Sequence, residues 1–95
     1  MKFYVYNFMK IDIIIPVRRS DFMKFENDVT KYVGAQIRKY RKARGMTQKE
    51  LGFRIGVKHN TISGYESGKN EPEQNILFAI ADVLGVSIND LFPPP

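Results

Sequence analysis

The chain has 95 residues, no cysteine and a formal net charge of +5 at pH 7. A chain of this length can bury one modest core, and without cysteine it has neither a disulfide nor a thiolate metal site to reinforce that core. The single histidine, His59, has no clustered carboxylates beside it in the sequence. We therefore expect one small domain with no metal and no other cofactor.

Positive charge is concentrated in the middle of the chain. Residues 1–30 hold five Lys or Arg against four acids, residues 31–69 hold ten against two, and residues 70–95 hold none against four. The resulting sums of +1, +8 and −4 indicate a localised positive field, which would attract a polyanion to one surface. The alternative is a basic face that is merely solvated.

The N-terminal segment is apolar but is interrupted by Asn7, Lys10 and Asp12. It is shorter than the roughly 18 to 20 apolar residues that span a bilayer and has no small-residue cleavage site, so we predict neither a membrane anchor nor export, and a cytoplasmic location. Its β-branched and aromatic residues, and its alternation around Lys10 and Asp12, predict a strand that ends at Pro16. We assign residues 1–27 to an extension that forms a β-strand arm.

The apolar spacing becomes helical from about residue 28. Val33, Ile37 and Tyr40 form one stripe, and Gly45 provides a left-handed stop. This pattern predicts a first helix over residues 28–44.

The motif TQKE at residues 47–50 predicts the start of a second helix. It is a capping box, in which the Thr47 hydroxyl accepts from the Glu50 amide while the Glu50 carboxylate accepts from the Thr47 amide. The helix is expected to run to about Ile55, and Gly56 then forces a tight turn.

Two further helices and a final turn complete the domain. The helix around residues 58–66 is short and polar, with Ile62 facing inward and Tyr65 partly inward. The segment EQNILFAIADVLG predicts the next helix, which stops at Gly85. The apolar stripe of that helix consists of Leu77, Ile80, Ala81 and Leu84.

The predicted fold class is all-α, after the N-terminal strand. Ser87 to Asp90 begin the final turn, so residues 28–92 hold five short helices, and residues 93–95 form a proline tail.

Four motifs occur together in residues 37–92: R-x-x-R-G-x-T-Q, L-G-x-x-x-G-V, T-I-S-x-Y-E-x-G, and P followed by A-x-x-L-G-V-S. In this combination the segment resembles the helix-turn-helix domain of phage repressors and Cro, the XRE family of DNA-binding regulators. The resemblance implies a five-helix lambda-repressor-like fold. It also implies that the second helix crosses the DNA backbone while the third enters the major groove.

The resemblance implies roles for outward-facing residues. Asn60 would contact adenine and Lys58 guanine, while His59 and Ser63 would read several base edges. The phosphate-contacting residues that it implies are Gln48, Thr61, Lys69, Asn70, Arg41 and Lys42. Arg41 also matches a position that pairs with the glutamate ending the third helix, here Glu66.

Two residues depart from the family pattern. Lys58 stands where relatives carry a Ser or Thr N-cap, so either the helix start frays or Asn60 caps it instead. Gly64 stands where many relatives carry a base-reading side chain, so readout would rely more on DNA shape.

These features predict a sequence-specific regulator that binds double-stranded DNA, acts as a repressor, and binds a palindromic operator as a homodimer. No residue pair in Thr47 to Pro72 resembles a catalytic dyad, so we expect no enzyme and no small-molecule substrate. The alternative is an antitoxin-like protein-interaction module whose DNA binding is secondary or autoregulatory.

Two dimer interfaces are left open by the sequence. One is a two-stranded ribbon formed by residues 1–22 of both subunits, and the other is the last helix around Leu91 and Phe92. Met23 would also be a plausible start for a small regulator, in which case the residues before it are a misassigned extension.

Overall fold

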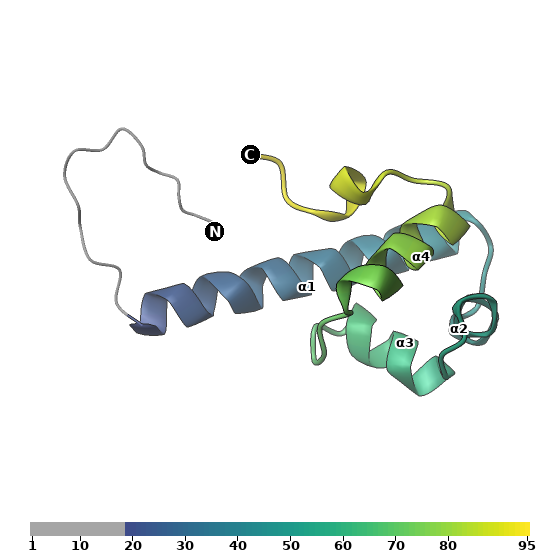
Figure 1. The fold of residues 1–95 in the computed structure, drawn as a ribbon, viewed down its shortest axis with the longest axis horizontal. Coiled ribbons are helices and arrows are strands. Elements are labelled where there is room, and N and C mark those ends of the chain that lie inside the picture. The colour runs from purple at the N-terminus through teal and green to yellow at the C-terminus, as the bar shows by residue number, and fades with distance from the viewer. Residues whose placement is uncertain (1–18) are drawn as a thin grey trace.

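The computed structural model describes residues 19–95 (Figure 1). They form α1 (Arg19–Ala43), α2 (Gln48–Ile55), α3 (His59–Glu66), α4 (Gln74–Leu84) and the 3-10 helix η2 (Ile88–Leu91). No strand occurs within residues 19–95, which confirms the all-α class for this part of the chain. The predicted count of five helices is wrong in one respect, because the last element is a single 3-10 turn.

The first helix begins at Arg19 instead of residue 28. Residues 19–27, which we assigned to the extension, are therefore helical, while the predicted strand in residues 1–18 lies outside the described residues. The physical reason is local, because no Gly or Pro interrupts residues 19–33 and Ser20 and Asp21 are favoured in the first turn of a helix.

Local signals set the start of α2 and the ends of α2 and α4, as predicted. The capping box before α2 is present: the Glu50 amide donates to Thr47 Oγ1 at 3.0 Å, and the Thr47 amide donates to Glu50 Oε1 at 2.8 Å. Gly56 and Gly85 end α2 and α4 with left-handed φ values of 79° and 71°.

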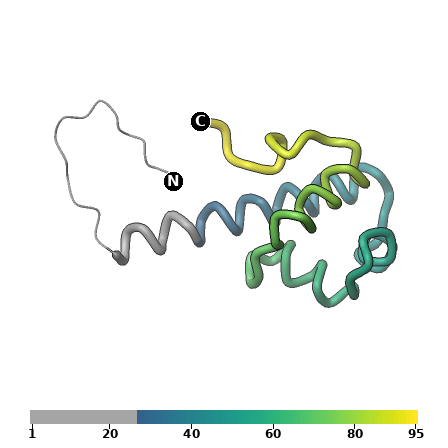
Figure 2. The backbone as a smooth tube through the Cα atoms, in the orientation of Figure 1, coloured from purple at the N-terminus to yellow at the C-terminus, as the bar shows by residue number. Residues whose placement is uncertain are grey.

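The helices enclose one core (Figure 1). α3 packs against both α1 and α2, while α4 lies beside the C-terminal half of α1. After α4 the chain returns over α1, where η2 packs (Figure 2). Tyr65 is buried more completely than we predicted. Among residues 27–95, the core consists of Val33, Ile37, Leu51, Ile62, Tyr65, Leu77, Ile80, Ala81, Leu84 and Leu91.

Two glycines allow the close approach that positions α3. A Cβ on Gly34 of α1 would overlap the backbone carbonyl oxygen of Tyr65, and a Cβ on Gly52 of α2 would lie 2.5 Å from the carbonyl oxygen of Val57. Any side chain at these positions would push backbone away. The end of α3 is thus held against α1, and the turn before α3 against α2.

None of the helices among the described residues is long and apolar enough to cross a membrane.

Candidate nucleic-acid interface

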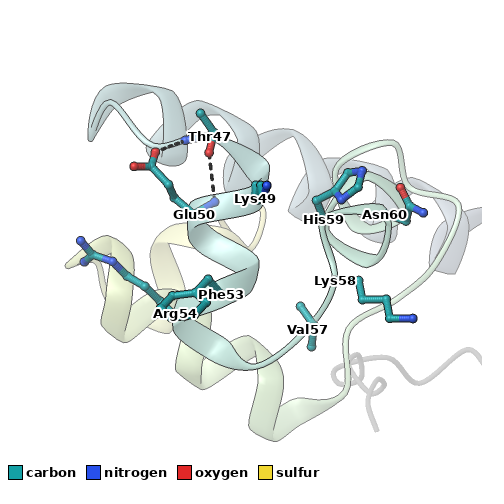
Figure 3. A pocket seen from close by; sticks show the side chains of 9 residues that line it. All are labelled: Thr47, Lys49, Glu50, Phe53, Arg54, Val57, Lys58, His59 and Asn60. Carbon is teal, nitrogen blue, oxygen red and sulfur yellow. Dashed lines mark hydrogen bonds between the residues drawn. The ribbon is translucent and has the colours of Figure 1, made fainter.

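The four residues predicted to read bases lie at the surface of the start and middle of α3. Lys58, His59, Asn60 and Ser63 are all exposed, whereas Ile62 is fully buried in the core. Figure 3 shows the first three at the N-terminal end of the helix. Burial of Ile62 therefore anchors α3 by one side and leaves polar side chains on another.

Lys58 is the N-cap residue of α3, and its side chain makes no capping hydrogen bond. The alternative that Asn60 caps the helix is wrong, because the helix already begins at His59. The carbonyl of Lys58 accepts from the amides of Thr61 and Ile62. With no side-chain acceptor at this end, the helix N-terminus retains its partial positive charge for an anion such as a phosphate.

A buried ion pair ties α1 to the end of α3. Arg41 Nε donates to Glu66 Oε2 at 2.6 Å and Arg41 Nη2 donates to Glu66 Oε1 at 3.0 Å. The hydrogen bond to Glu66 raises the pKa of Arg41 above its ordinary value, so the guanidinium is fully charged. The resemblance implied this pair, and the structure brings the two residues together in bidentate geometry.

The same pair is connected to the start of α2. Arg41 Nη1 donates to the Met46 carbonyl at 2.7 Å, and Gln48 Nε2 donates to Glu66 Oε1 at 3.0 Å. Arg38 lies at the edge, with Nη1 3.9 Å from Glu66 Oε1. The Glu66 carboxylate therefore links three helices, α1, α2 and α3. The hydrogen bond from Gln48 to Glu66 was not predicted from the sequence.

This network separates two residues that we grouped as phosphate contacts. Arg41 is 6% exposed and its nitrogens are bonded inward, so we assign it to the structural pair alone. Gln48 is half-buried, and its amide nitrogen has a second hydrogen that Glu66 does not use. That hydrogen can still be donated to a phosphate.

The remaining predicted phosphate contacts lie on three different segments. Lys42 is exposed in the last turn of α1, Thr61 is half-buried in α3, and Lys69 and Asn70 are exposed in the loop after α3. The structure therefore distributes them over α1, α3 and the loop after α3.

Asn70 covers Gly64, the residue that stands where many relatives carry a base-reading side chain. The amides of Lys69 and Asn70 both donate to the Gly64 carbonyl, at 3.0 and 3.1 Å. A Cβ on Gly64 would lie 2.5 Å from Asn70 Nδ2. Gly64 is thus buried beneath the loop and presents no open position to a ligand.

A groove of about 720 Å³ separates α2 from the start of α3 (Figure 3). The side chain that sequence reasoning missed here is Phe53, which is 87% exposed. Leu51 and Gly52 provide the buried side of α2, so the next residue faces solvent. The groove is lined by Thr47, Lys49, Glu50, Phe53, Arg54, Val57, Lys58, His59 and Asn60.

Comparisons with known proteins agree with this geometry. The helix-turn-helix family model matches residues 37–91. An uncharacterized HTH-type transcriptional regulator of Archaeoglobus fulgidus is 42% identical over 57 residues, which cover 60% of this chain and 81% of that protein. The structure of the P22 c2 repressor in complex with a synthetic operator has a TM-score of 0.62 and 33% identity, and the match covers 66% of this chain and 96% of that one.

A longer relative matches over part of its length. A putative multi-protein-binding factor 1 of Yarrowia lipolytica is 38% identical over 72 residues, which cover 76% of this chain. The chain spans about half of that relative, at 47% of its length.

Proposed function

Because this chain belongs to the helix-turn-helix family, we propose that it binds double-stranded DNA and regulates transcription. The observation that carries the proposal is the polar surface of α3, where Lys58, His59, Asn60 and Ser63 are exposed above a buried Ile62. A helix anchored in this way can enter the major groove and place donors and acceptors against base edges.

We propose further that recognition is sequence-specific. Asn60 would make a bidentate contact to adenine and Lys58 would reach guanine, while Gln48, Lys69 and Asn70 would contact phosphates. The hydrogen bonds that hold Gln48 on Glu66 and the loop on Gly64 support this division, because they fix the phosphate-contacting groups relative to α3.

The regulator would act as a repressor and as a homodimer on a palindromic operator. A domain of this size can occlude a promoter, and two symmetric copies would read two half-sites one helical turn apart. The exposed Phe92 beside η2 supports an interface at the C-terminal end of the described residues.

Selection of bound duplexes from a random pool tests specificity and symmetry together. We expect a palindrome with half-sites separated by about 10 base pairs. Recovery of unrelated sequences would contradict sequence-specific binding, and a single asymmetric site would contradict the dimer.

Two substitutions separate base reading from positioning. Asn60→Ala should weaken binding to the selected duplex by about 1 to 3 kcal/mol and leave non-specific binding nearly unchanged. Gln48→Ala should weaken specific and non-specific binding alike. Affinities for the selected and a scrambled duplex would be measured at one salt concentration. Equal losses on both duplexes for Asn60→Ala would show that Asn60 reads no base.

A protein-interaction module is the second candidate function. It is favoured by the name of the Yarrowia relative, a putative multi-protein-binding factor. In an antitoxin-like module, a tight protein complex would form at salt concentrations that abolish DNA binding. Measuring both affinities across salt concentrations distinguishes the two candidates.

A further inference from the structure

The groove between α2 and α3 offers more than a base-reading surface. Its α3 side is formed by Lys58, His59 and Asn60, which the proposed function already uses. Its α2 side adds Phe53, and Val57 lies between the two sides (Figure 3). A ligand that fills the groove would therefore touch apolar groups and base-reading residues at once.

Phe53 is the most exposed large hydrophobic residue among residues 27–95, at 87%, compared with 50% for Phe78 and 38% for Phe92. Single exposed apolar residues are common, but this one lies in a groove beside a second apolar residue, Val57. An aromatic ring offers a phosphate no hydrogen bond, whereas burial against an apolar side chain is favourable. The ring is therefore better suited to a protein than to the DNA backbone.

The charges lining the groove are mainly positive. Lys49 and Lys58 have no ion-pair partner in the described part of the chain. Arg54 lies close enough to Glu50 to contribute to lowering the pKa of that carboxyl, but the Glu50 carboxylate is already hydrogen-bonded to the Thr47 amide. Three cations against one engaged carboxylate favour a negatively charged partner.

We propose that this groove docks an acidic segment of a partner protein, which packs an apolar side chain on Phe53 and excludes DNA from Lys58, His59 and Asn60. The docking depends only on the shape, exposure and charge of the groove. The exclusion of DNA rests on the proposed function, because it requires that these three residues bind DNA.

A synthetic peptide provides the probe for docking to the full chain. It would have roughly 15 residues, about four helical turns, with Asp and Glu as its only charges and Phe and Leu on one face. One control peptide replaces the apolar residues by Ser, and another replaces the acids by Asn and Gln. We expect the parent peptide to bind at physiological salt. The affinity of each control peptide should be lower by about tenfold or more.

Two substitutions on the protein locate the binding site. Phe53→Ser should lower the affinity for the parent peptide by about tenfold or more, because one buried aromatic contact is lost. Phe78→Ser is the matched control, since it removes an exposed ring of α4 that does not line the groove. Circular dichroism would verify that both variants fold. Absence of binding to the parent chain, or equal losses for the two variants, would overturn the docking proposal.

Competition with the selected duplex tests the exclusion. The parent peptide should displace DNA from the parent chain, whereas DNA bound to the Phe53→Ser variant should resist displacement. The DNA affinity of this variant should stay within about twofold of the parent, because Phe53 offers DNA no polar contact. Simultaneous binding of peptide and DNA would overturn the exclusion.

If DNA or a second copy of the chain occupies the groove instead, Phe53→Ser gives a different result. A tenfold loss of DNA affinity in Phe53→Ser would identify DNA as the occupant, and a change in its sedimentation would identify a second copy of the chain. Either result overturns the proposal. Binding of the peptide by a chain that binds no duplex would leave the docking intact and refute the proposed function.

Discussion

At the scale of single residues, the Arg41–Glu66 pair is the feature on which the orientation of α3 depends. Arg41 is 6% exposed and Glu66 is 9% exposed, and the carboxylate also accepts from Gln48. Removing one partner of such a pair leaves an uncompensated buried charge, which costs more than the pair itself contributes. Loss of either partner is therefore expected to destabilise the fold.

Glu66→Ala should lower the free energy of unfolding by about 3 kcal/mol, because Arg41 would remain charged without its acceptor. Urea denaturation measures this difference. Arg38→Ala is the control, since the Arg38 side chain is 53% exposed and 3.9 Å from Glu66, and it should cost less than about 1 kcal/mol. A Glu66→Ala variant as stable as the parent would mean that water reaches the pair.

Glu50 gives a prediction about pH. The Thr47 amide, and secondly the Thr47 hydroxyl, hold the folded-state pKa of Glu50 below its ordinary value of 4.5. A lowered pKa stabilises the fold above the unfolded-state pKa, and this contribution is lost as the pH falls through the folded-state value. The free energy of unfolding of the parent should therefore exceed that of Glu50→Gln at neutral pH, and the difference should shrink below about pH 4.5. A difference that does not change with pH would contradict this origin.

At the scale of elements, α3 combines a weak start with a firmly held end. Lys58 provides no side-chain cap, whereas Glu66 is fixed by α1 and α2. Polar residues at the start of the helix are then free to meet a ligand. Function and helix stability are in conflict at this position, because a good N-cap residue would replace a side chain proposed to read bases.

Lys58→Ser tests this conflict. We expect it to raise the free energy of unfolding by about 1 kcal/mol through a new capping hydrogen bond. We also expect it to weaken binding to the selected duplex by about 1 to 3 kcal/mol. Thermal unfolding and DNA titration measure the two effects. Lys58→Ala, which removes the lysine without adding an acceptor, should lose the same DNA affinity and gain no stability. Unchanged DNA affinity in both variants would remove Lys58 from the base-reading set.

At the scale of the whole molecule, tertiary structure leaves the charge of the middle segment intact. Arg41 and Glu66 neutralise each other inside the core, so residues 31–69 present nine exposed basic residues against Glu50. The exposed sum is still +8. The exposed basic residues lie on α1 and the turn after it, on α2, at Lys58 directly before α3, and at Lys69 in the loop after α3.

This charge predicts a strong dependence of DNA affinity on salt. If each subunit of a dimer contacts about three to five phosphates, the slope of log affinity against log salt concentration should be roughly −5 to −9. Titrations of the selected duplex at several salt concentrations measure the slope. A slope near −1 would mean that the basic residues do not contact the DNA backbone.

Much of the fold could be predicted from the sequence because its signals are local. The capping box of Thr47 and Glu50, the stops at Gly56 and Gly85, and the apolar spacing that buries Ile62 each depend on residues within a few positions of one another. The beginning of α1 was missed for the same reason, since Ser20 and Asp21 can either break a helix or start one.

The sequence by itself determined where the helices after α1 lie and that positive charge is concentrated in residues 31–69, because helix periodicity and formal charge do not require knowledge of distant neighbours. Only the tertiary structure decided that Arg41 is buried, that Gln48 is bonded to Glu66, and that Phe53 faces an open groove. Each of these depends on which helix lies beside the side chain, and contacts between residues far apart in the chain are fixed only when the helices pack.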